Sequence, residues 1–86
     1  MTAKVDVYST TYCPYCRAAE RMLEEKGVAY NAYDVTHDTE KRNWLVQSSG
    51  QTTVPQIYIN DQPIGGFTDM QALNRQGKLD QMLELA

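Results

Sequence analysis

Two strand-like runs with a helical stretch between them make up the first third of the chain. Residues 4–9 and 28–35 are rich in β-branched and aromatic side chains, which is typical of strands. Between them, apolar residues recur at helical spacing from Cys16 to Leu23, and Gly27 ends this helix. A strand, a helix and a strand in this order predict a β-α-β unit with two parallel strands and a right-handed crossover.

The rest of the chain predicts a second helix, a hairpin and a C-terminal helical segment. The helix starts near Thr36 or Asp38 and ends at Gly50, and its apolar side predicts Trp44 to be a core residue. Residues 54–59 form a third strand, and a tight turn leads to an edge strand at 62–65, where a proline cannot donate to a sheet. A capping-box pattern at Thr68 starts the last helix. The predicted order is therefore β-α-β-α-β-β-α with a short final helix, an α/β fold.

Length and composition predict a single domain that covers residues 1–86. The hydrophobic content of 42% and charged content of 22% are ordinary for a globular protein. A net charge of −3 gives no reason to expect nucleic acid or a membrane surface as a partner. Without a membrane-length apolar run or a signal-peptide pattern, we expect a cytoplasmic protein. We also expect it to be a monomer. In a reducing cytoplasm a disulfide is transient.

The two cysteines, Cys13 and Cys16, form a C-x-x-C pair where the first strand passes into the first helix. This spacing at that place is typical of a redox pair that cycles between dithiol and disulfide. The helix N-terminus favours an anion, and a Cys13 thiolate is that anion. The alternatives are half of a metal site and a structural disulfide. A zinc site needs two further ligands, of which only His37 is available, so we expect redox chemistry and no metal.

The element order with C-x-x-C after the first strand resembles the thioredoxin fold, and three motifs resemble the small dithiol glutaredoxins. The motifs are Cys13-Pro14-Tyr15-Cys16, Thr53-Val54-Pro55, and Gly65-Gly66 followed by Thr68-Asp69. The resemblance implies a four-stranded mixed sheet with the strand order 2-1-3-4, flanked by helices. It also implies glutathione as a co-substrate.

The resemblance assigns roles to individual residues. Cys13 is the implied nucleophile and Cys16 the implied resolving thiol. The implied glutathione contacts are Tyr15, Thr53, Val54, Pro55, Gly66, Thr68 and Asp69. A cis Pro55 would leave the main chain of Val54 free to pair with glutathione, although base rates alone favour a trans proline at the start of a strand. Thr68 and Asp69 would hold the γ-glutamyl group at a helix N-terminus, where the alternative is a plain helix cap.

Two further positions concern the charges around glutathione. Arg42, on the second helix, is expected to bind the glycyl carboxylate; a solvated surface arginine is the alternative. Many glutaredoxins have a lysine three residues before the first cysteine, and this chain has Thr10 there. The nearest obvious substitute cation is Arg17, one turn into the helix.

The resemblance implies a glutathione-dependent thiol–disulfide oxidoreductase that reduces protein disulfides and glutathione mixed disulfides. Its implied partners are glutathione and glutathionylated or disulfide-containing proteins, with ribonucleotide reductase among the candidates. One alternative is a redoxin reduced by thioredoxin reductase, against which the glutathione motifs argue. The other is a non-catalytic iron–sulfur cluster carrier, against which the stiffening residue Pro14 argues.

Overall fold

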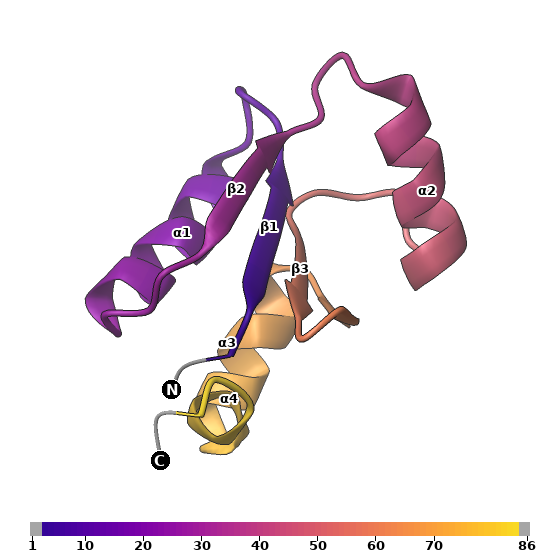
Figure 1. Ribbon diagram of the computed structural model, residues 1–86. Coiled ribbons are helices and arrows are strands. Elements are labelled where there is room, and N and C mark those ends of the chain that lie inside the picture. Colours follow the sequence, from indigo (N-terminus) through magenta and orange to yellow (C-terminus); the bar gives the residue numbers. More distant parts are fainter. Residues whose placement is uncertain (1–2, 85–86) are drawn as a thin grey trace.

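The computed structural model describes residues 3–84 and has the predicted element order (Figure 1). The elements are β1 (Val5–Ser9), α1 (Pro14–Glu25), β2 (Asn31–Asp34), α2 (Thr39–Ser49), β3 (Gln56–Ile59), β4 (Gln62–Gly65), α3 (Phe67–Arg75) and α4 (Lys78–Met82). Among the described residues, no helix combines the length and the apolar character that crossing a membrane would need.

The four strands form one mixed sheet in the order β2-β1-β3-β4, which confirms the expected topology. The central strand β1 pairs in parallel with β2, where Val7 lies opposite Ala32. On its other side β1 pairs antiparallel with β3, where Val7 lies opposite Ile57. The edge strand β4 continues the sheet antiparallel to β3. The β-α-β unit predicted for the first third of the chain is therefore present.

The sheet separates a large core from a small one, because alternate residues of a strand point to opposite faces. Val5, Val7, Ile57 and Ile59 face the large core, which α1, α3 and α4 complete with fully buried residues such as Leu23. Among the described residues, four buried side chains make up the small core on the α2 side. They are Tyr8, Val35, Leu45 and Tyr58.

The second strand is shorter than predicted. Of the expected residues 28–35, only Asn31–Asp34 form β2, and all four are exposed. The buried Val28 lies before the strand, where its N–H donates to the carbonyl of Leu23 at 3.0 Å and closes the end of α1. Val28 and Val35, which made residues 28–35 resemble one long strand, are therefore buried residues of the connections before and after β2.

Trp44 is not the core residue that the sequence predicted, since 42% of it is exposed. Its ring stacks on that of Tyr58 at a centroid distance of 5.4 Å, and the Nζ atom of Lys41 lies 4.8 Å from its ring centroid. Trp44, Leu45 and Val46 are consecutive, so a helix spreads them around its axis and only one can face the sheet. That residue is Leu45, the one buried residue of α2.

The helix that was predicted to start at Thr68 starts earlier. Helix α3 begins at Phe67 with Gly66 as its N-cap, so Thr68 is inside the first turn instead of capping it. The carboxylate of Asp69 accepts a hydrogen bond from the N–H of Gly66 at 2.9 Å, which is one half of a capping box. Gly77 has a φ of 76° and separates α3 from α4.

Leu23 provides a test of the large core, because it is fully buried between α1 and the sheet. We expect Leu23→Ala to lower the free energy of unfolding by about 2–5 kcal/mol, since it leaves a cavity. Urea unfolding measures this change. Glu25→Ala, at an exposed position on the same helix, serves as the control and should change it by less than about 0.5 kcal/mol. Equal effects of the two substitutions would contradict this packing.

Candidate active site

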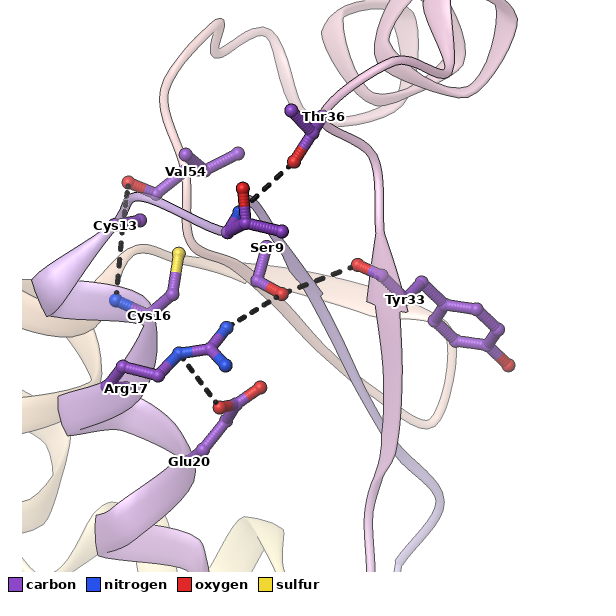
Figure 2. Close-up of polar contacts among 9 residues, drawn as sticks. Ser9, Cys13, Cys16, Arg17, Glu20, Tyr33, Thr36 and Val54 are labelled. Carbon is purple, nitrogen blue, oxygen red and sulfur yellow. Dashed lines mark hydrogen bonds and ion pairs between the residues drawn. The ribbon is translucent and has the colours of Figure 1, made fainter.

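The sulfur of Cys13 caps the N-terminus of α1. Cys13 is the N-cap residue with extended backbone angles, and its Sγ accepts a hydrogen bond from the N–H of Cys16 at 3.2 Å (Figure 2). Pro14 takes the first helical position, where a missing N–H costs no hydrogen bond. The first free N–H groups and the positive end of the helix dipole therefore lie at this sulfur and favour its thiolate.

The carbonyl of Val54 lies against the same sulfur. The Cys13 thiol donates to this oxygen at 3.7 Å, a distance within reach of a sulfur donor. Val54 precedes the paired part of β3, which starts at Gln56, so its main chain is outside the sheet ladder. The peptide bond between Val54 and Pro55 is cis, as the resemblance implied. A segment far away in the sequence thus presents main-chain groups beside the sulfur.

The two thiols of the motif are in different environments. Cys16 is fully buried, whereas Cys13 is only partly buried. Burial, reinforced by the hydrogen bond with Cys13, raises the pKa of the Cys16 thiol to about 12. Cys16 is therefore protonated at neutral pH, and Cys13 is the thiol that an incoming disulfide can reach.

A cleft of about 290 Å³ opens beside this pair. It is lined by Tyr15, Gln51, Thr53, Val54, Pro55, Gly66, Phe67, Thr68 and Asp69. The fold thus brings all three sequence motifs to one cavity. Gln51 and Phe67 were missed by sequence reasoning, and the ring of Phe67 lies 6.2 Å from that of Tyr15. Their only signal in the sequence is that each lies within two residues of a motif.

The end of the cleft at α3 is shaped by close packing of Asp69 on two glycines. Gly65 has a φ of 107°, and a Cβ atom there would collide with the Asp69 carboxylate. The neighbouring Gly66 donates its N–H to that carboxylate. Only glycine lets the main chain come this close, so the Gly-Gly turn holds a negative charge at the helix entrance.

Arg42 lies outside this cleft. It lines an adjoining hollow of about 220 Å³, together with residues that include Leu45, Val46 and Gln56. Val54 lines both the hollow and the cleft, so the two cavities meet at the residue that faces Cys13. The binding of a glycyl carboxylate by Arg42 stays a prediction.

Arg17, the expected substitute for a cation at position 10, acts on the cysteine pair only at a distance: its charge favours a lower pKa of the Cys16 thiol, against the larger effect of burial. The guanidinium of Arg17 donates to Ser9 Oγ at 3.3 Å and pairs with Glu20 at 3.3 Å (Figure 2). Within residues 3–84, none of its hydrogen bonds or ion pairs reaches Cys13. Thr10 is also not a surface position, because only 1% of it is exposed. The positive group in direct contact with the Cys13 sulfur is therefore the N–H of Cys16 at the helix terminus.

A metal site is not evident in the described part of the chain. No group of three or more His, Cys, Asp or Glu side chains in residues 3–84 is placed to hold a metal ion.

A buried and a partly exposed cysteine at the start of a helix, on a four-stranded mixed sheet, define a dithiol redox protein with the thioredoxin fold. The chain belongs to the glutaredoxin family, whose model matches residues 5–64. It is 42% identical over 82 residues to glutaredoxin 3 of Escherichia coli strain K12, covering 95% of this chain and 99% of that one.

Further comparisons agree with this assignment. The glutaredoxin of Pseudomonas aeruginosa is 43% identical over 79 residues, which are 92% of this chain and 94% of that protein. The crystal structure of a buckwheat glutaredoxin–glutathione complex superposes with a TM-score of 0.88 at 30% identity, covering 95% of this chain and 77% of that one. The fold and family together support thiol–disulfide oxidoreductase activity.

The burial of Cys16 predicts a loss of stability at alkaline pH. Its pKa rises from 9.0 to about 12 on folding, so the folded protein holds this proton more tightly than the unfolded chain. The resulting stabilisation is complete below pH 9 and is lost as the pH rises from 9 towards 12. Over this interval we expect the free energy of unfolding to fall more steeply in the reduced wild-type protein than in Cys16→Ser, by about 1 kcal/mol per pH unit. Urea unfolding under reducing conditions measures both slopes, and equal slopes would refute the assignment.

Proposed function

We propose that this protein is a glutathione-dependent thiol–disulfide oxidoreductase that reduces protein disulfides and glutathione mixed disulfides. The observation that carries the proposal is the cleft, which is lined by Val54, whose carbonyl lies at the Cys13 sulfur, and by the N-terminus of α3. Its polar groups suit a tripeptide with a carboxylate at one end and a sulfur in the middle. The likeness to a glutaredoxin crystallised with glutathione supports the same ligand.

In this proposal the cysteinyl part of glutathione pairs with the main chain of Val54, as an extended peptide pairs with a strand. The γ-glutamyl carboxylate accepts from the free N–H groups at the start of α3 and from Thr68. The carboxylate of Asp69 pairs with the α-ammonium group of glutathione. Tyr15, Thr53, Pro55 and Gly66 complete the walls.

The glycyl carboxylate of glutathione would point towards Arg42. The hollow that holds Arg42 meets the cleft at Val54, so an extended tripeptide that passes this residue can reach the guanidinium. A hydrogen-bonded pair between a guanidinium and a carboxylate then fixes the second end of the ligand.

The reaction begins when the Cys13 thiolate attacks the glutathionyl sulfur of a mixed disulfide. A new disulfide forms between Cys13 and glutathione, the old one breaks, and the protein thiolate leaves and takes a proton from solvent. A second glutathione, as thiolate, then attacks the glutathionyl sulfur on Cys13. This step releases oxidised glutathione and returns the Cys13 thiolate.

Protein disulfides need the second thiol. Cys13 attacks one sulfur and becomes joined to the protein, and the second protein sulfur leaves as a thiolate. Cys16 then loses its proton and attacks Cys13, which closes the C-x-x-C disulfide and frees the reduced protein. Two glutathione molecules reduce this disulfide again.

The proposal also covers the compartment, the oligomeric state and the protein substrates. We place the protein in the cytoplasm, as a monomer that acts on glutathionylated or disulfide-containing proteins, with ribonucleotide reductase as one candidate. The glutathione pool of that compartment is reducing enough to keep the pair as a dithiol.

Two cysteine substitutions separate the two routes. We expect Cys13→Ser to abolish all activity, because it removes the exposed nucleophile. Cys16→Ser should still remove glutathione from a small glutathionylated thiol, which needs one sulfur, and lose most of its reduction of protein disulfides. Assays of both variants on both substrates decide this, and activity in Cys13→Ser would end the assignment.

The source of electrons is tested in a coupled assay. With NADPH, glutathione and glutathione reductase, we expect steady NADPH consumption in the presence of a disulfide substrate. With NADPH and thioredoxin reductase in place of the glutathione system, we expect only the background rate. The reverse outcome would identify a redoxin of the thioredoxin-reductase type and reject glutathione dependence.

A further inference from the structure

The two most exposed large hydrophobic side chains of the described residues flank the nucleophile. Tyr12, immediately before Cys13, is 70% exposed, and Tyr15, two residues after it, is 62% exposed. Single exposed apolar residues are common on protein surfaces. Two large aromatic rings on either side of a reactive sulfur are a more specific feature, because tyrosine is enriched where proteins bind each other.

Tyr12 differs from the other exposed aromatic residues in its contacts. Tyr15 packs near Phe67, Tyr33 stacks on Tyr8 at 5.0 Å, and Trp44 stacks on Tyr58. Within residues 3–84, the ring of Tyr12 takes part in no aromatic pair. It is also not among the residues that line the cleft. The ring is therefore available to a partner that the cleft does not hold.

The geometry of the reaction determines which partner reaches the ring of Tyr12. A disulfide must come within bonding distance of the Cys13 Sγ atom, so the molecule that carries it passes over the neighbours of Cys13. In the proposed function a glutathionyl group lies on the Tyr15 side, inside the cleft that Tyr15 lines. A protein segment is larger than the cleft and also covers the residue before Cys13.

We propose that Tyr12 is a docking contact for the protein substrate, and that an apolar side chain next to the substrate cysteine packs on its ring. This inference rests on the proposed function. The occupant is an extended segment of a protein that carries a disulfide or a glutathionyl group on its cysteine. Tyr15 contributes to binding glutathione, whereas Tyr12 selects among protein substrates.

The bonds of the mixed-disulfide reaction place the substrate near this ring. The Cys13 thiolate attacks the glutathionyl sulfur, and the protein sulfur bonded to it leaves as a thiolate that takes a proton from solvent. The leaving sulfur is thus separated from Cys13 by one atom in the transition state. In our proposal the residues beside that cysteine extend over the exposed side chain of Tyr12, which directly precedes Cys13.

The test uses two glutathionylated peptides and one small substrate. The peptides have the sequences Leu-Cys-Leu and Ser-Cys-Ser within an otherwise identical chain, and the small substrate is glutathionylated 2-mercaptoethanol. We expect Tyr12→Ser to raise KM for the Leu-Cys-Leu peptide about five- to tenfold, with kcat little changed, because the contact contributes to binding. The other two substrates should be unaffected.

Two control variants make the test specific. Tyr12→Phe keeps the ring and should keep the preference for the Leu-Cys-Leu peptide. Tyr33→Ser removes an exposed tyrosine on β2, outside the cleft, and should leave all three substrates unchanged. The thermal unfolding midpoints of Tyr12→Ser and Tyr12→Phe should match that of the wild type, because the Tyr12 side chain is exposed.

Other outcomes would overturn the inference. An equal loss by Tyr12→Ser on all three substrates would mean that the residue supports the active site in general. No loss on any substrate, or a loss of the preference in Tyr12→Phe, would exclude ring packing against the substrate. If the wild-type protein turned over none of the glutathionylated substrates, the proposed function itself would fail, and this inference with it.

Discussion

The hydrogen bond from the Cys16 N–H to the Cys13 sulfur fixes the position of the reactive atom. A helix N-cap is usually an oxygen of Ser, Thr, Asp or Asn, and here a sulfur takes that place. Because the cap is also the nucleophile, the start of α1 determines where chemistry can happen. That start is fixed in turn by Pro14 and by the end of β1 at Ser9, the strand that both neighbouring strands hold in place.

The rest of the site is built around this atom from the second half of the chain. The loop before β3 brings the carbonyl of Val54 to the sulfur, and the hairpin of β3 and β4 turns the chain so that α3 points its N-terminus at the same cleft. Much of this surface is main chain, so its chemistry depends on backbone position more than on side-chain identity. The residues that allow it are Pro55, Gly65 and Gly66, which let the backbone take these positions.

Local patterns were sufficient for the order of elements and for the pair Cys13 and Cys16, because strand alternation, helix stops and motif spacing are short-range properties. These patterns failed at positions where tertiary packing determines whether a side chain is buried and what it contacts. Trp44 lies in a helix with three consecutive large apolar residues, and only the packed sheet determines which of them is buried. Thr10 is buried although Thr11 and Tyr12 after it are exposed, and Arg17 donates to Ser9 and not to Cys13; both depend on tertiary contacts. The cleft joins residues about 40 positions apart, so the resemblance to a family was needed to connect them.

The unequal cores on the two faces of the sheet have a consequence for motion. Helix α2 buries a single residue, Leu45, whereas α1 alone buries three. Segments with few buried apolar contacts open at a lower free energy than the core. Tyr15, which lines the cleft, belongs to α1 with its three buried residues, whereas Val54, which also lines it, packs on the small core under α2. The two sides of the cleft thus belong to units that open at different free energies. The width of the cleft can change through the α2 side without unfolding of the helix that carries the nucleophile.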